Sequence, residues 1–260
     1  MASTERNQAP PDTSPLLRWG KTIVDLVCVV LVVMAAKTAI AEPFYVPSGS
    51  MEPTLLIGDE LLATKYPYGY STASLPALLD LPSTGRIMGA VPKRGDVVVF
   101  RWPGNRSQVW VKRVIGLPGD RIAMRDGQVI INGKPAPLTP DGIGRAESEN
   151  GSLGDAHRFV ETLPGGRKHL IFKLVPREPL DNMATVKVPP GHLFVMGDNR
   201  DNSADSRVPV SAGGVGLLPV ANLVGRVDAI VGSWDLGMES RPLWTWPSGL
   251  RLSRFFTGVH

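Results

Sequence analysis

The longest apolar stretch of the chain lies near its N-terminus, from Thr22 to Ala41. It holds about 20 predominantly apolar residues, the length that an α-helix needs to cross a bilayer, and Leu26 to Ala36 carries no charge. Arg18 and Lys21 precede the stretch, and several acidic residues follow it. Because lysine and arginine favour the cytoplasmic side, the pattern predicts a disordered cytoplasmic segment over residues 1–21, one N-terminal transmembrane helix over residues 22–41, and the remaining chain outside.

Two alternatives remain for this stretch. A buried helix of a soluble protein is seldom apolar on all sides over such a length. A cleavable signal peptide would also show a charged start, an apolar core and a small-x-small site, here Ala39-Ile40-Ala41. Lys37 interrupts the apolar run just before that site, which favours an anchor that stays uncleaved.

Beyond residue 45, short runs of β-branched and apolar residues alternate with glycine and proline, and helical periodicity is almost absent. Such runs, for example Val97–Phe100, Val109–Ile115 and His192–Met196, are typical of strands. The pattern predicts a mainly β body. We expect a distorted antiparallel β-barrel core from residues 42–122 and 188–233, with a smaller β-lobe inserted over residues 123–187.

Two further segments suit a membrane surface. Residues 234–260 form a C-terminal tail, and its stretch 241–256 mixes tryptophan, arginine and phenylalanine, as interfacial segments do. Within the loop 71–92, Leu75 to Leu81 is apolar enough to touch lipid. Packing against the body is the alternative for both segments.

Composition narrows the function classes. The net charge is +4, but no basic stripe interleaved with aromatic residues appears, so we expect no nucleic-acid partner. A mildly basic chain also suits a surface of anionic lipid. The single cysteine, Cys28, excludes an intramolecular disulfide and a thiolate zinc cluster. We expect no cofactor and no metal.

The first segment with candidate chemistry is Pro47–Leu55, which reads PSGSMEPTL. Two serines around a glycine, between prolines, suit a rigid turn with an approachable backbone. The segment lacks the Gly-x-Ser-x-Gly pattern of the α/β-hydrolases. Taken alone, it is more often a solvated loop than a nucleophile.

The second segment is the predicted strand Val109–Ile115. Alternate residues of a strand share a face, so Lys112 lies with Trp110 and Val114, and Arg113 lies on the opposite face. An amine held among apolar groups has a lowered pKa, and a neutral amine can activate a serine where no histidine is available. A lysine that reaches solvent at a sheet edge is the alternative.

The third segment, Gly197–Arg207, reads GDNRDNSADSR. A calcium loop counted from Asp201 fails, because its sixth and twelfth positions lack glycine and glutamate. Asx-type turns are the structural alternative. On a functional interpretation, a hydroxyl here orients a neighbouring amine, and Asp205 pairs with Arg207 or Arg113 to hold the corner rigid.

A Ser-His-Asp triad remains an alternative to a lysine base, because a triad is recognised by its geometry and not by the order of its residues along the chain. None of the four histidines lies in a recognisable triad motif, although His192 lies just upstream of the third segment, Gly197–Arg207. The four histidines are His157, His169, His192 and His260.

Taken in order, the three segments resemble bacterial type I signal peptidase, also called leader peptidase. Ser-Gly-Ser-Met-x-Pro-Thr-Leu is similar to that family's nucleophile box, and Arg-Gly-Asp-Val-Val-Val-Phe and Val-Lys-Arg-Val-Ile-Gly-Leu-Pro-Gly-Asp are similar to its base boxes. Gly-Asp-Asn-Arg-Asp-Asn-Ser-x-Asp-Ser-Arg is the most distinctive match. The resemblance covers residues 42–120 and 188 to about 233. Some members carry two N-terminal spans, and this chain shows one.

The resemblance implies a membrane-bound serine endopeptidase that removes signal peptides from exported preproteins. It implies Ser50 as nucleophile and Lys112 as general base. It further implies Ser48, with the Ser50 amide, as oxyanion hole and Ser203 as the group that orients the lysine. Three residues would be structural charges near the site: Asp205, Arg207 and Arg113.

The resemblance also implies a location. The chain would be a single-pass protein of the bacterial inner (cytoplasmic) membrane, with its catalytic β domain on the periplasmic face. Its partners would be preprotein signal peptides and the phospholipid bilayer. Two other function classes remain: a non-catalytic membrane-tethered β module that binds partners or envelope polymers, and a protease of the same chemistry that cleaves itself.

Overall fold

A computed structural model describes residues 15–74, 85–147, 153–174, 179–238 and 242–259. The chain divides into two units, one ending at Lys37 and one comprising residues 38–260. The expected disorder of residues 1–14 and the lipid contact predicted for Leu75–Leu81 lie outside the described residues.

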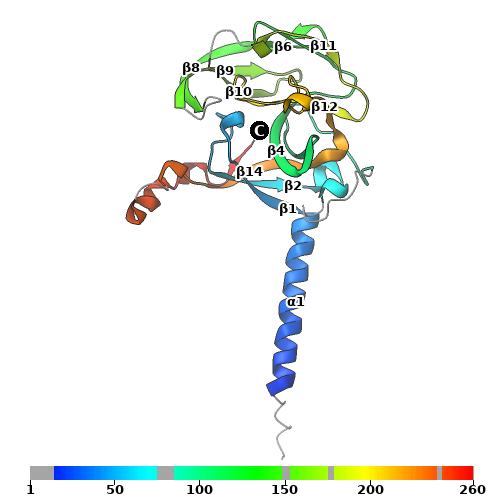
Figure 1. Cartoon of the computed structure of the whole chain (residues 1–260), viewed down its shortest axis with the longest axis vertical. Helices are drawn as coiled ribbons and strands as arrows, with labels where there is room; N and C mark the ends of the chain where they lie inside the picture. The colour runs from blue at the N-terminus through cyan, green and yellow to red at the C-terminus, as the bar shows by residue number, and fades with distance from the viewer. Residues whose placement is uncertain (1–14, 75–84, 148–152, 175–178, 239–241, 260) are drawn as a thin grey trace, which may run out of the picture. The chain divides into compact units, whose positions relative to one another are not determined.

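The first unit consists of helix α1 (Pro15–Ala39), drawn in blue in Figure 1. It begins inside the segment expected to be disordered, and proline suits a first helical turn because its φ is already helical. Its described large apolar side chains, from Trp19 to Val33, are exposed. Within the described residues, no helix is both long enough and apolar enough to qualify as a membrane span.

The second unit is built around one eight-stranded sheet in which the order is β1-β2-β14-β3-β4-β12-β13, with β15 paired to β14. All its ladders are antiparallel. The strands are β1 (Ala41–Tyr45), β2 (Asp59–Thr64), β3 (Val97–Trp102), β4 (Asn105–Gly116), β12 (His192–Met196), β13 (Leu218–Pro219), β14 (Leu223–Ser233) and β15 (Thr257–Gly258).

The mainly β prediction is confirmed, but the closed barrel is not found. The strand order begins at β1 and ends at β13, and these two strands are not paired in the described part of the chain. β13 has only two residues, which pair with His192 and Leu193. So short an edge offers too few backbone groups to join another strand and close the sheet.

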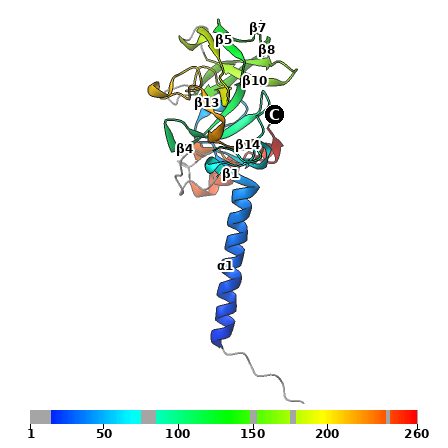
Figure 2. The same cartoon turned by 90° about the vertical axis from the view of Figure 1, so that its right-hand side faces the viewer.

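Two smaller sheets follow β4 along the chain. One has the order β10-β9-β8 and the other β11-β5-β6-β7. Apart from the first two residues of β5, their strands lie within residues 123–187, where an inserted lobe was expected. In both views they lie at the opposite end of the unit from β1 (Figures 1 and 2). Their strands are β5 (Arg121–Arg125), β6 (Gln128–Ile131), β7 (Lys134–Pro135), β8 (Leu138–Glu147), β9 (Leu153–Thr162), β10 (Lys168–Lys173) and β11 (Met183–Lys187).

Short 3₁₀-helices connect the strands in the described residues. They are η1 (Gly49–Met51), η2 (Tyr66–Tyr68), η3 (Thr72–Ser74), η4 (Pro179–Asp181), η5 (Val210–Ala212), η6 (Val220–Asn222), η7 (Leu236–Met238), η8 (Leu243–Gly249) and η9 (Leu252–Arg254).

Strand β3 shows why the centre of the sheet is rigid. Val97 and Val99 belong to one buried apolar cluster, and Val98 and Phe100 belong to another on the opposite face. A continuous apolar run of this kind is typical of a strand covered on both faces. Burying each such side chain contributes about 1.5–3 kcal/mol. β4, which carries Lys112, pairs directly with this strand.

Candidate active site

The candidate nucleophile lies in the loop that joins β1 to β2. These strands form an antiparallel pair with Tyr45 opposite Glu60, and the amide of Val46 donates to the carbonyl of Asp59 at 2.9 Å. We call residues 46–58 the nucleophile loop. Ser50 lies in η1 and is partly buried.

Asn199 holds this loop from the opposite side. Its backbone amide donates to the Ser50 carbonyl at 3.2 Å, and its side-chain Nδ2 donates to the Gly49 carbonyl at 3.2 Å. Gly197 allows this close approach, because a Cβ there would lie 2.4 Å from the Ser50 carbonyl oxygen and 2.3 Å from the Ser203 hydroxyl. The predicted Gly-Asp-Asn-Arg corner therefore packs directly against the nucleophile loop.

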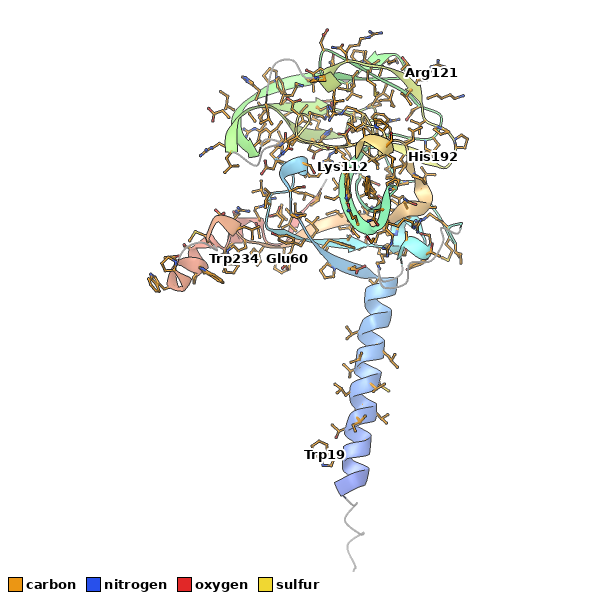
Figure 3. The ribbon with its side chains drawn as sticks, viewed as in Figure 1. Trp19, Glu60, Lys112, Arg121, His192 and Trp234 are labelled. Atoms are coloured by element: carbon orange, nitrogen blue, oxygen red, sulfur yellow. The ribbon has the colours of Figure 1, made fainter. Side chains whose placement is uncertain are left out.

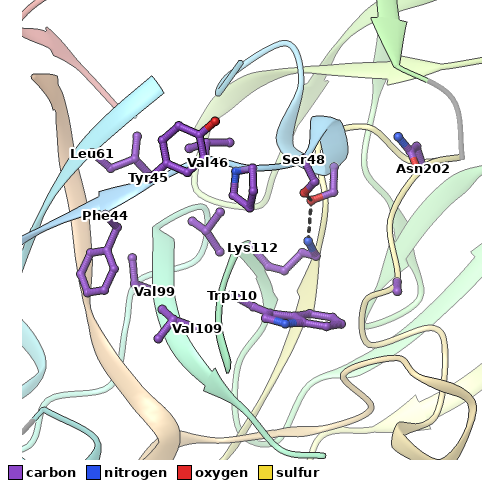
Figure 4. A pocket seen from close by; sticks show the side chains of 14 residues that line it. Phe44, Tyr45, Val46, Ser48, Leu61, Val99, Val109, Trp110, Lys112 and Asn202 are labelled. Atoms are coloured by element: carbon purple, nitrogen blue, oxygen red, sulfur yellow. Dashed lines mark hydrogen bonds between the residues drawn. The ribbon is translucent and has the colours of Figure 1, made fainter. Parts of the chain in front are cut away.

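Lys112 reaches the same loop from β4. It pairs with Val98 of β3, is 4% exposed, and lies inside the β unit (Figure 3). A hydrogen bond of 2.7 Å joins its Nζ to the Ser50 Oγ, drawn as the dashed line in Figure 4. Its Nζ also lies 5.7 Å from the centroid of the Trp110 ring, the neighbour that strand alternation placed on the same face.

Burial lowers the pKa of Lys112 from 10.5 to about 8. The carboxylates of Asp205 and Asp198 act in the opposite direction by favouring the ammonium, and Arg207 adds to the lowering. Since water solvates the charged form best, an amine removed from water loses its proton more readily. A substantial share of Lys112 is therefore neutral near physiological pH, the form that can accept a proton from Ser50.

A cavity of about 500 Å³ opens beside the two side chains. β1, the nucleophile loop and β4 together supply most of its walls, and aromatic and branched apolar side chains dominate them (Figure 4). The lining residues are Phe44, Tyr45, Val46, Pro47, Ser48, Ser50, Leu61, Val99, Val109, Trp110, Val111, Lys112, Asn202 and Ala204.

The two remaining predicted hydroxyls differ in position. Ser48 is exposed, and its Oγ lies 3.5 Å from the Ser50 Oγ. Ser203 is buried near Gly197, and its Oγ has no hydrogen-bond partner among the described residues. The bond expected from Ser203 to the lysine is thus not present here. The amine is directed to Ser50 instead, and a buried hydroxyl without a partner is costly enough to call for a role.

The predicted structural charges form two buried ion pairs. Arg207 pairs with Asp205 at 2.8 Å, as expected. Of the two partners that the sequence left open for Asp205, the structure thus has Arg207, and Arg113 pairs with Asp198 through Nε at 2.8 Å and Nη2 at 2.7 Å. Arg113 follows Lys112 directly and points to the other face of β4, which brings it to Asp198 rather than to Asp205.

The sequence interpretation missed a second charged group behind this corner. Arg200 makes a bidentate ion pair with Glu161 of β9, and His169 lies 3.3 Å from the same carboxylate. All three side chains are buried. Glu161 lies opposite His169 because β9 pairs with β10 in this register. The Gly197–Arg207 motif contains Arg200 but carries no information about that register.

The described histidines do not take part in a triad with Ser50. His169 contacts Glu161 and lies 3.9 Å from Asp198, while His192 hydrogen-bonds the carbonyl of Pro190. Among the described residues, no group of three or more histidine, cysteine or carboxylate side chains is arranged to hold a metal ion.

Comparison with known proteins agrees with the motifs. The family model described as signal peptidase, peptidase S26, matches residues 16–234. The protein named Signal peptidase I of Rickettsia typhi (strain Wilmington) is 37% identical over 254 aligned residues, covering 90% of each chain. That of Rickettsia massiliae (strain Mtu5) is 35% identical, covering 99% of this chain and 98% of the relative.

Solved structures also match, among them a signal peptidase I. The crystal structure of a signal peptidase I from Enterococcus faecalis V583 aligns with a TM-score of 0.30 at 25% sequence identity, covering 52% of this chain and 96% of that one. The resemblance drawn from the sequence motifs is confirmed by the family model and the full-length relatives. The chain belongs to the signal peptidase family, peptidase S26.

Proposed function

We propose that this member of the signal peptidase family is a membrane-bound serine endopeptidase that removes signal peptides from exported preproteins. Ser50 acts as nucleophile and neutral Lys112 as general base. The single observation that carries the proposal is the 2.7 Å contact between Lys112 Nζ and Ser50 Oγ beside an apolar cavity, where burial lowers the pKa of the amine.

The reaction follows from this contact. The Ser50 Oγ attacks the scissile carbonyl carbon while its proton passes to Lys112 Nζ, and the carbonyl oxygen becomes an oxyanion. When the tetrahedral intermediate collapses, the peptide C–N bond breaks and the Lys112 ammonium protonates the leaving amine. An acyl ester on Ser50 remains. A water then attacks this ester, giving one proton to Lys112, which returns it to the Ser50 oxygen.

Ser48 suits the oxyanion role. Its hydroxyl lies close to the Ser50 Oγ without pairing with Lys112, so it is available to donate to the developing negative charge, together with the Ser50 amide. One such donor is typically worth about 10²–10³ in rate. We assign Ser203 to orient the amine after proton transfer: its buried Oγ is not bonded to Lys112 in this structure, has no partner among the described residues, and can accept a hydrogen bond from the Lys112 ammonium. Arg113, Asp205 and Arg207 keep the corner rigid through their ion pairs.

The substrate is an extended peptide that lies along the cavity between β1 and β4. β1 is an edge strand, and an extended segment can add to a sheet edge through backbone hydrogen bonds. The cavity is narrowed by apolar side chains, among them Trp110, Val109 and Phe44. The resemblance to signal peptidases implies small side chains at the first and third positions before the cut, and these would fit such walls.

We assign the membrane anchor to the apolar stretch Thr22–Ala41, most of which lies in α1. Support comes from its length of about 20 residues, from its charge-free centre, and from the exposed apolar side chains of the helix. The basic residues before it and the acidic residues after it favour a cytoplasmic N-terminus. The catalytic unit then lies on the periplasmic face.

The test is cleavage of a purified preprotein by the full-length protein in lipid vesicles, with enzyme far below substrate. Ser50→Ala and Lys112→Met should abolish cleavage. The controls Ser211→Ala and Lys187→Met, at exposed positions outside the cavity, should cleave at the wild-type rate. Cleavage by Ser50→Ala would refute the assignment of Ser50 as nucleophile. A wild-type protein that leaves the preprotein uncut would favour the non-catalytic β module that binds partners. Cleavage that stops after one turnover would favour self-processing.

A further inference from the structure

The C-terminal segment reaches back to the nucleophile loop through one side chain. Arg254, at the end of η9, donates from Nη2 to the backbone carbonyl of Thr54 at 3.0 Å. The same guanidinium makes two hydrogen bonds to Asp59, from Nε at 3.0 Å and from Nη2 at 2.6 Å. Arg254 therefore binds both the nucleophile loop, at Thr54, and the first residue of β2, Asp59.

Asp59 is the fixed end of this arrangement. Its side chain is fully buried, and its Oδ2 also accepts the amide of Leu56 at 2.8 Å. Its backbone carbonyl accepts the amide of Val46, which closes the loop at the start of β2. A buried carboxylate needs a cation with matching geometry, and a planar guanidinium provides it.

Thr54 connects the C-terminal segment to the catalytic corner. Its Oγ1 donates to Asp198 Oδ2 at 2.5 Å, and Arg113 donates to the same Oγ1 at 3.2 Å. The amide of Leu55 binds the carbonyl of Met51, so the backbone between Thr54 and Ser50 has little freedom. Thr54 is thus held on one face by the Gly-Asp-Asn-Arg corner and on the other by Arg254.

We propose that Arg254 is a positioning residue for Ser50, an inference that rests on the proposed function. By fixing the Thr54 carbonyl relative to Asp59, it keeps the Ser50 hydroxyl at hydrogen-bonding distance from Lys112. The residue lies beyond the region matched by the family model, which ends at residue 234. It does not line the cavity, so it acts on the nucleophile rather than on substrate binding.

The experiment compares Arg254→Ala and Arg254→Lys with wild type in preprotein cleavage by the full-length protein in vesicles. A misplacement of about 1 Å at a reacting atom costs about 10²-fold in rate. We expect kcat of Arg254→Ala to fall about 10- to 100-fold with KM nearly unchanged. Arg254→Lys should keep only part of the wild-type kcat, because a lysine lacks the planar guanidinium that binds two acceptors at once. Arg158→Ala, which removes an exposed arginine–aspartate pair, should match wild type.

Chemical rescue separates positioning from loss of fold. Ethylguanidinium at millimolar concentration should restore a large part of kcat to Arg254→Ala, and ethylammonium should restore less, while neither should change wild type or Arg158→Ala. Wild-type kcat in Arg254→Ala, a rise in KM alone, or a loss that ethylguanidinium does not rescue would overturn the proposal. Failure of the proposed function is distinct, because wild type itself would then leave the preprotein uncut.

Discussion

The pH dependence of cleavage follows from the state of one amine. Burial lowers the pKa of Lys112 to about 8, and in the mechanism we propose only its neutral form accepts the Ser50 proton. At about pH 7, one unit below this value, about a tenth of the lysine is neutral, and at about pH 9 about nine tenths is. We therefore expect kcat/KM to rise roughly tenfold over this interval and then to level off.

An amine with the ordinary pKa of 10.5 would behave differently. Its neutral fraction would be about 0.03% at about pH 7 and about 3% at about pH 9, so the rate would rise roughly a hundredfold and would still be rising. The assay is kcat/KM for one preprotein, measured in vesicles from about pH 6 to pH 10. A profile that is flat, or one still rising at its alkaline end, would refute the reasoning.

The Ser203→Ala variant refines this test. If the Ser203 hydroxyl only orients the amine, its removal lowers the plateau of the profile and leaves the midpoint near 8 almost unmoved. A plateau equal to that of wild type would remove Ser203 from the catalytic machinery.

Three further predictions concern the corner behind the site. Gly197→Ala should lower kcat/KM about 10²-fold, because the new Cβ would lie 2.4 Å from the carbonyl oxygen of Ser50; unchanged activity would show that the nucleophile loop is not packed as described. Arg113→Met leaves Asp198 buried without its cation and should lower the free energy of unfolding by about 3–5 kcal/mol, measured by urea unfolding; a loss below 1 kcal/mol would contradict it. Burial alone would raise the pKa of Glu161, but its arginine and histidine partners outweigh burial and hold it at about 2. The ionised Glu161 therefore stabilises the fold fully above the ordinary pKa of 4.5, and this contribution is lost as pH falls toward 2. In Glu161→Gln the free energy of unfolding should depend less on pH over this interval. A pH dependence equal to that of wild type would contradict the lowered pKa of Glu161.

Much of the site was accessible from the sequence because its parts are local. Strand alternation predicted that Lys112 lies on the same face as Trp110 and that Arg113 lies on the opposite face. In the structure Lys112 lies near the Trp110 ring, and Arg113 points the other way, to Asp198. The Ser-Gly-Ser turn between prolines marked the nucleophile loop. Each of these features depends on residues close together along the chain.

The parts that sequence reasoning missed depend on register and on distant contacts. Arg113 meets Asp198 across 85 residues, and Arg254 meets Asp59 across 195. No periodicity specifies such pairings, since many aspartates and arginines are available. The barrel prediction failed for a similar reason, because closure depends on whether the last strands are long enough to pair.

The central claim is that burial lowers the pKa of Lys112 to about 8 in the folded protein, so that part of its amine is neutral at working pH. A direct measurement is a heteronuclear NMR titration of protein with ¹³C-labelled lysine side chains, in which the Lys112 signal is assigned by its absence in Lys112→Arg. The account predicts a midpoint near 8, as burial sets it. A midpoint near the ordinary 10.5 would contradict it.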